Sequence, residues 1–77
     1  MSEQLSKLVR QLSNVDPEVR REAIRALGKL HDRAAVEPLL PHLTDDNVKI
    51  RLAAARALGR IGDPAAVDAL LLRLEDP

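Results

Sequence analysis

The chain contains no cysteine and no aromatic residue of any kind. Without cysteine it has no disulfide, no thiolate nucleophile and no cysteine ligand for zinc. Without Phe, Tyr or Trp, its core must be built from Leu, Ile, Val and Ala, and it lacks the rings on which single-stranded nucleic acids usually stack. Its 77 residues suffice for one small domain with an aliphatic core.

The chain also lacks an excess of either charge and a long apolar run. Its 12 basic and 12 acidic side chains cancel, so net charge gives no reason to expect a polyanionic partner. No apolar stretch approaches the roughly 20 residues of a membrane span, so no membrane association is expected. Residues 1–4 lack the basic start and the following apolar segment of a signal peptide. We therefore expect a soluble cytoplasmic protein.

What the chain does contain is an internal repeat. Residues 16–45 match residues 47–76 without a gap, at an offset of 31 residues. Identical residues recur at many positions of the two copies, for example Arg20 and Arg51, Ala26 and Ala57, Gly28 and Gly59. The opening segment, residues 2–14, matches the second half of a copy. Such a period is typical of a repeat protein whose units stack on one another.

Each copy carries two apolar stripes with helical spacing. The first stripe has the spacing i, i+3, i+4, i+7 and consists of Val36, Leu39, Leu40 and Leu43. The second runs along the other helix of a copy and consists of Ile50, Ala54, Ala57, Leu58 and Ile61. This periodicity predicts amphipathic helices and no strands. The predicted fold is all-α, with five helices at about 3–13, 17–30, 34–44, 48–61 and 65–75, and short connections favour antiparallel neighbours.

Helix boundaries carry their own chemical signals. Asp16-Pro17 and Asp63-Pro64 each combine a side-chain acceptor at the N-cap with a proline at the first helical position. Asn47 occupies the equivalent N-cap of the fourth helix. Gly62 and His31 follow the predicted helices 48–61 and 17–30 at the position where a left-handed residue is wanted.

The third helix contains two prolines, Pro38 and Pro41, after a start signal at Asp32. An interior proline removes a hydrogen bond and clashes with the preceding turn, at a cost of about 3 kcal/mol. Either this helix is kinked, or its regular part begins near Glu37, which would make Pro38 tolerable and only Pro41 costly. We expect Pro41→Leu to raise the melting temperature.

The sequence resembles the HEAT-like repeats of the phycobilin-lyase subgroup. The resemblance rests on the pattern Val19-Arg20-x-x-Ala23-x-x-Ala26-Leu27-Gly28-x-Leu30-x-Asp32 and on its second copy from Ile50-Arg51. It implies an α-α superhelix (a HEAT-like solenoid) of about two and a half repeats in a single domain, 1–77. The units would be a half repeat at 2–14 and inner-plus-outer helix pairs at 16–45 and 47–76. Designed repeat proteins of this type are also similar, so a natural, an engineered and a fragmentary origin all stay open.

Several motifs favour structure over chemistry. Gly28 and Gly59 lack the flanking residues of a phosphate loop, so close helix packing explains them better. His31-Asp32 resembles the start of a metal site, but further ligands at suitable spacing are missing. The resemblance implies that Arg20 and Arg51 pair with carboxylates near the turns, here Asp32, Asp45, Asp46 or Asp63; contact with an anionic ligand is the alternative. No nucleophile and base can be assembled, so we expect no enzyme, no metal and no cofactor.

A basic strip on the two inner helices is the main candidate for binding. It consists of Arg21, Arg25, Lys29, Lys49, Leu52, Arg56 and Arg60. A solvated face is the simplest interpretation of the strip, since exposed cations on helices usually need no partner and Glu18 and Glu22 dilute the charge. Of the binding interpretations, the leading one is a contact surface for a protein or peptide; the alternative is a small nucleic-acid-binding module that uses the cations of the strip.

The last predicted helix presents a second apolar line, made of Ala65, Ala69 and Leu72. No further inner helix follows to cover this line, whereas terminal repeats normally need a polar outer face. The line predicts self-association, most simply as a homodimer through the C-terminal helix. A fragment of a longer solenoid would show the same feature.

Overall fold

The computed structural model describes residues 2–62, and these residues form helices joined by short turns. The elements, in chain order, are α1 (Glu3–Gln11), α2 (Pro17–Leu30), the 3₁₀ turn η1 (Arg33–Ala35), α3 (Val36–Leu39), the 3₁₀ turn η2 (Leu40–Thr44) and α4 (Val48–Ile61). There is no strand among the described residues, so the predicted all-α class is confirmed. The predicted helix 65–75 lies outside them.

The inner helices α2 and α4 begin and end where the sequence predicts. Asp16 caps α2 by accepting a hydrogen bond from the Glu18 N–H at 2.9 Å, and Pro17 follows as the first helical residue. Asn47 caps α4 by accepting from the Lys49 N–H at 2.8 Å. Because each cap satisfies a donor that the helix itself leaves unpaired, the start of each helix is set by local chemistry.

The C-terminal ends of the same helices use left-handed residues. His31 ends α2 with φ 54°, and Gly62 ends α4 with φ 71°. Glycine adopts this conformation without steric cost, whereas a residue with a β-carbon meets its own carbonyl there. The first repeat therefore closes its inner helix with a strained histidine, where the second uses glycine.

The first helix is shorter than predicted. It ends at Gln11, two residues before the expected end, and its side-chain cap is Ser2, which accepts from the Leu5 N–H at 3.1 Å. The following N–H groups of Leu12 and Ser13 donate to carbonyls three residues back. The chain thus tightens into a 3₁₀-type turn before it enters α2.

The third predicted helix is broken into three short pieces. Asp32 starts it as expected, accepting from the Ala34 N–H at 2.9 Å, but the first turn is 3₁₀. The α-helical part covers only Val36–Leu39, and a 3₁₀ turn takes over at Leu40. The predicted helix 34–44 is therefore interrupted, and its α-helical part begins at Val36, next to the expected start near Glu37. The reason for the interruption is Pro41, which has no N–H to continue the α-helical ladder and whose ring disfavours it.

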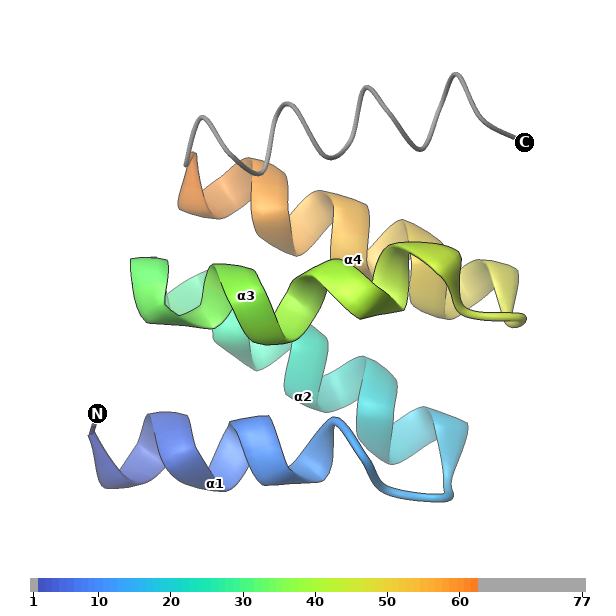
Figure 1. Cartoon of the computed structure of the whole chain (residues 1–77), viewed down its shortest axis with the longest axis horizontal. Coiled ribbons are helices and arrows are strands. Elements are labelled where there is room, and N and C mark those ends of the chain that lie inside the picture. The colour runs from blue at the N-terminus through green and yellow to red at the C-terminus, as the bar shows by residue number, and fades with distance from the viewer. Residues whose placement is uncertain (1, 63–77) are drawn as a thin grey trace.

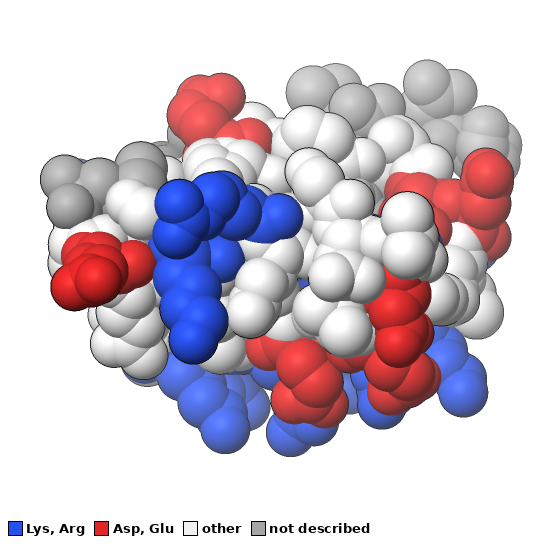
Figure 2. Space-filling model, turned by 90° about the horizontal axis from the view of Figure 1, so that it is seen from below, with Lys and Arg blue, Asp and Glu red and all other residues white. Residues whose placement is uncertain are grey.

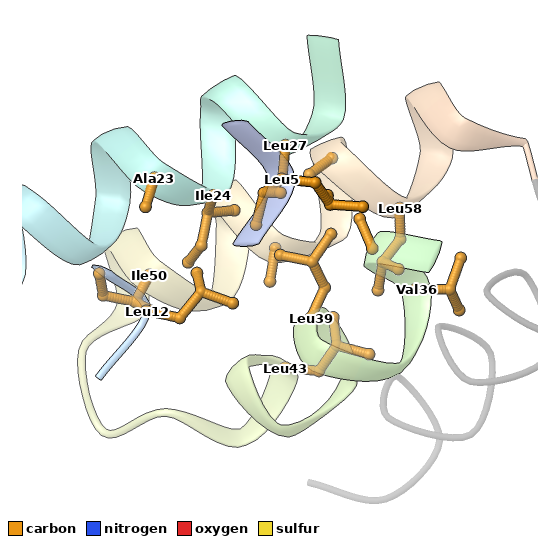
Figure 3. Close-up of a cluster of buried hydrophobic side chains, with 13 residues drawn as sticks. Leu5, Leu12, Ala23, Ile24, Leu27, Val36, Leu39, Leu43, Ile50 and Leu58 are labelled. Carbon is orange, nitrogen blue, oxygen red and sulfur yellow. The ribbon is translucent and has the colours of Figure 1, made fainter. Parts of the chain in front are cut away.

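The elements form two layers. In Figure 1, α2 and α4 lie side by side behind the segment 33–44, and successive helices run in opposite directions. The most extensive contact in the described part joins α2 and α4, while α1 packs on α2. Figure 3 shows aliphatic side chains from both layers converging on one core. The buried core residues are Leu5, Leu12, Ala23, Ile24, Leu27, Ala35, Val36, Leu39, Leu43, Ile50, Ala54, Ala57 and Leu58.

The inner helices approach closely at one glycine. A β-carbon at Gly28 would lie 2.8 Å from Cα of Ala57 and 2.9 Å from its Cβ, which is too close for two carbon atoms. Packing of α4 against α2 therefore requires glycine at this position, as predicted. At Gly59, its counterpart in the second copy, a β-carbon would meet no described atom within 4 Å apart from the backbone of its own helix. Among residues 2–62, the packing explanation thus holds for Gly28 and not for Gly59.

Each turn before an inner helix is held by an arginine of that helix. Arg20 donates from Nη1 to the main-chain oxygens of Asn14 at 2.8 Å and Val15 at 3.1 Å. Arg51 does the same in the next copy, donating to the oxygens of Asp45 at 2.7 Å and Asp46 at 3.2 Å. We call this arrangement the turn clamp. The prediction that these arginines pair with carboxylates is wrong for these contacts, because main-chain oxygens accept the bonds.

Candidate functional site

A groove of about 320 Å³ runs between α2 and α4. Its volume is within the range of about 300–1,000 Å³ that ligand pockets usually have. Its lining consists of Arg21, Arg25, Lys49, Leu52, Ala53, Arg56, Ala57 and Arg60. Among the described residues that line it, five are cationic, three are apolar and none is acidic. The groove therefore combines a positive rim with a short apolar strip.

Helical geometry places the α4 side of the groove. Lys49, Leu52, Arg56 and Arg60 are spaced i, i+3, i+7 and i+11, so they follow one line along the helix. We call this line the α4 rim. Ala53 and Ala57 lie on the next line toward α2 and add apolar surface to the groove. Leu52 stands out from the rim with 52% of its surface exposed.

On the α2 side of the groove, the positive charges of the two arginines are compensated by acidic neighbours. Arg21 lies 3.1 Å from a carboxylate oxygen of Glu18, and Arg25 lies 3.4 Å from one of Glu22. Both pairs join residues three apart on the same exposed helix face, so each adds only a few tenths of a kcal/mol. The Nε atom of Arg21 is buried and finds no acceptor within residues 2–62.

The three cations of the α4 rim differ from those of α2. Within residues 2–62, no acidic side chain makes a salt bridge to Lys49, Arg56 or Arg60. The face of the molecule seen in Figure 2 carries basic and acidic side chains together, in keeping with the balanced net charge. The groove is therefore a local concentration of positive charge on a protein that is neutral as a whole.

The groove gathers most of the strip that was predicted from the sequence. Six of the seven strip residues line the groove. The exception is Lys29, which lies one turn after Arg25 on α2. Ala53 and Ala57 were not predicted as site residues. They could have been predicted from the sequence, because they are small residues four apart that adjoin the line of cations on the same helix. The predicted self-association residues, Ala65, Ala69 and Leu72, lie outside the described residues.

The two histidines have local roles. His31 at the end of α2 places Nδ1 2.9 Å from the carbonyl oxygen of Lys29. His42, in η2, is half-buried, and this burial lowers its pKa from the ordinary 6.5; nearby Arg20 lowers the pKa further, and Asp45 acts in the opposite direction. The lowered pKa favours the neutral form of His42.

Residues 2–62 hold no group of three or more His, Cys, Asp or Glu side chains arranged to bind a metal ion. In the same part of the chain, no helix combines the length and the apolar character that crossing a membrane requires.

Comparison with known proteins agrees with the geometry. A family model described as HEAT repeats matches residues 5–77, which is nearly the whole chain. Comparison with curated proteins finds no match. The matched region contains both copies of the 31-residue repeat, the paired layers of helices and the groove between the inner helices. The chain belongs to the HEAT repeat family.

Proposed function

We propose that this chain is a non-enzymatic scaffold that binds a protein or peptide in the groove between α2 and α4. HEAT repeats generally mediate protein–protein interactions, and the family typically provides scaffolds and not catalysts. The observation that carries the proposal is the groove lining, in which five cations surround Leu52, Ala53 and Ala57. The half-exposed Leu52 offers apolar surface to a partner, and the three cations of the α4 rim make no salt bridge within residues 2–62.

A charge-unbiased random peptide library displayed on phage tests this proposal. The immobilised 77-residue chain is expected to enrich peptides that the double variant Arg56→Gln/Arg60→Gln does not enrich. The double variant Lys7→Gln/Arg10→Gln, on α1 and outside the groove lining, provides a control with the same change of charge. Equal recovery by all three proteins, or no enrichment at all, would contradict the proposal.

Self-association through the predicted helix 65–75 is a second part of the proposal. It is supported by the apolar line of Ala65, Ala69 and Leu72 in the sequence. Association adds stability by mass action, so the melting temperature should rise with protein concentration. Light scattering that reports a monomer at high concentration would refute self-association but would not affect the proposal that the groove binds a partner.

Nucleic acid is the alternative occupant, favoured by the five cations of the groove. Binding to phosphates releases counterions, so such binding should weaken steeply as salt rises. Titration with duplex and single-stranded DNA at low salt is the direct test. If the chain binds neither kind of DNA, the nucleic-acid alternative is excluded and only the protein or peptide interpretation remains.

A further inference from the structure

The two sides of the groove attract negative charge unequally. On α2, Arg21 and Arg25 each have a glutamate of their own helix at 3.1 and 3.4 Å. On the α4 rim, Lys49, Arg56 and Arg60 have no salt-bridge partner within residues 2–62. A carboxylate that enters the groove therefore meets uncompensated cations on α4 and has to compete with glutamates on α2. The acidic groups of a ligand are drawn to the α4 rim.

The spacing along that rim defines what fits. With a rise of about 1.5 Å per residue, Leu52 lies about 4.5 Å beyond Lys49 along the helix axis. Arg56 and Arg60 follow at about 10.5 and 16.5 Å. An extended peptide advances about 3.3 Å per residue, so alternate side chains on one face are separated by about 6.6 Å. Five extended residues thus span about 13 Å and place three side chains against the rim.

We infer that the groove binds an extended segment of a partner protein with the pattern acidic–x–apolar–x–acidic. This inference rests on the proposed function and names the class of its ligand. The first carboxylate meets Lys49, and the apolar side chain covers Leu52 and Ala53. The second carboxylate reaches the pair Arg56 and Arg60, where charge-assisted hydrogen bonds hold it.

The same geometry disfavours nucleic acid. A phosphate backbone needs an unbroken line of cations, whereas Leu52 interrupts the α4 rim with a half-exposed apolar side chain. Glu18 and Glu22, paired with the arginines of α2, place negative charge at the opposite side of the groove. Because these pairs are neutral, a backbone with a charge at every nucleotide gains little on the α2 side, whereas a short peptide needs only its two carboxylates to be matched on the α4 rim.

Titration of labelled peptides by fluorescence anisotropy tests the pattern directly. The test peptide is Ser-Glu-Ser-Leu-Ser-Glu-Ser; one control replaces both Glu by Gln, and another replaces Leu by Ser. Loss of both carboxylates should weaken binding about tenfold or more, since two charge-assisted contacts are removed. Loss of the leucine should weaken it about fivefold. A glutamine peptide that binds as well as the glutamate peptide overturns the inference.

Variants of the protein assign each contact. Arg56→Gln should remove most of the preference for glutamate over glutamine. Leu52→Ser should keep that preference but remove the preference for leucine over serine. Arg10→Gln, the matched control, should leave both unchanged. All three side chains are exposed, so the fold should persist, and circular dichroism checks this. If Arg10→Gln and Arg56→Gln weaken binding equally, the glutamate peptide is held by overall charge and not by contacts in the groove.

The failure of this inference differs from the failure of the proposed function. If the chain enriches peptides through the groove but these peptides lack the acidic–x–apolar–x–acidic pattern, the ligand class is wrong and the scaffold proposal stands. If no peptide is enriched, both fall. An oligonucleotide that binds more tightly than the glutamate peptide at low salt would overturn the assignment of a peptide.

Discussion

Two glycines at the same position of the repeat should respond to alanine with opposite signs. Gly28 faces Ala57 across the contact between α2 and α4, whereas a β-carbon at Gly59 would meet no described atom within 4 Å apart from the backbone of its own helix. Both lie in the interior of a helix, where alanine is more favourable than glycine by about 0.5–1 kcal/mol. Because this gain is common to the two substitutions, the difference between their changes in unfolding free energy measures the steric contact of a β-carbon at position 28 with Ala57.

The steric contact can be estimated from the distances. A β-carbon at Gly28 would lie 2.8 Å from the backbone Cα of Ala57. Ordinary contacts between carbon atoms are about 3.5–4.0 Å, so the helices must separate by roughly 0.7 Å or more. Overpacking of this kind costs about 1–3 kcal/mol. Gly28→Ala should therefore lower the free energy of unfolding by up to about 2 kcal/mol, while Gly59→Ala should raise it by about 0.5–1 kcal/mol.

Urea unfolding followed by circular dichroism measures both variants against the 77-residue parent chain. In a domain of this size, 1 kcal/mol corresponds to roughly 4–8 °C of melting temperature, so thermal unfolding should resolve the same difference. The decisive quantity is the gap between the two variants, expected at about 1–3 kcal/mol. If Gly28→Ala stabilises the chain as much as Gly59→Ala, the close approach of α2 and α4 is refuted.

Three further substitutions test other features. Pro41→Leu restores an N–H in η2 and should raise the melting temperature by several degrees; an unchanged or lower value would show that the broken helix carries no penalty. His42→Gln tests the lowered pKa: the unfolded chain takes up a proton on His42 more readily, so the parent should lose stability as pH falls below about 6.5. The variant should show a smaller loss between about pH 7.5 and pH 5, and parallel curves would argue against the assignment. His31→Gly relieves the left-handed strain at φ 54° and should add about 1 kcal/mol of unfolding free energy, less the contact to Lys29; destabilisation would mean that this contact outweighs the strain.

The inner helices were predictable because their ends are set by local chemistry. Each inner helix starts at a side-chain cap, Asp16 or Asn47, that accepts from a backbone N–H two residues further on. Each ends at a left-handed residue, His31 or Gly62, whose N–H donates to a carbonyl of the last turn. The third helix was not predictable in the same way. The prolines showed that a regular helix is disfavoured, but the sequence did not determine where the 3₁₀ turns would begin.

The groove was predictable in outline from helical periodicity. The line from Lys49 to Arg60 follows from spacing alone, since side chains three and four residues apart share a helix face. Which residue of α2 faces that line depends on how the helices pack, and this excluded Lys29 from the lining. The turn clamp was missed because its acceptors are carbonyls, whose directions exist only once the turn has formed.

The turn clamp has a consequence for how such a chain can lengthen. In each copy, the arginine bonds to a main-chain oxygen only six residues earlier, so arginine, turn and helix cap form one short segment. These contacts are local in sequence and close without a large loss of chain entropy. A duplicated segment 14–44, inserted after Thr44, would bring a complete connector with it. Growth by gene duplication would then require no new connector to evolve.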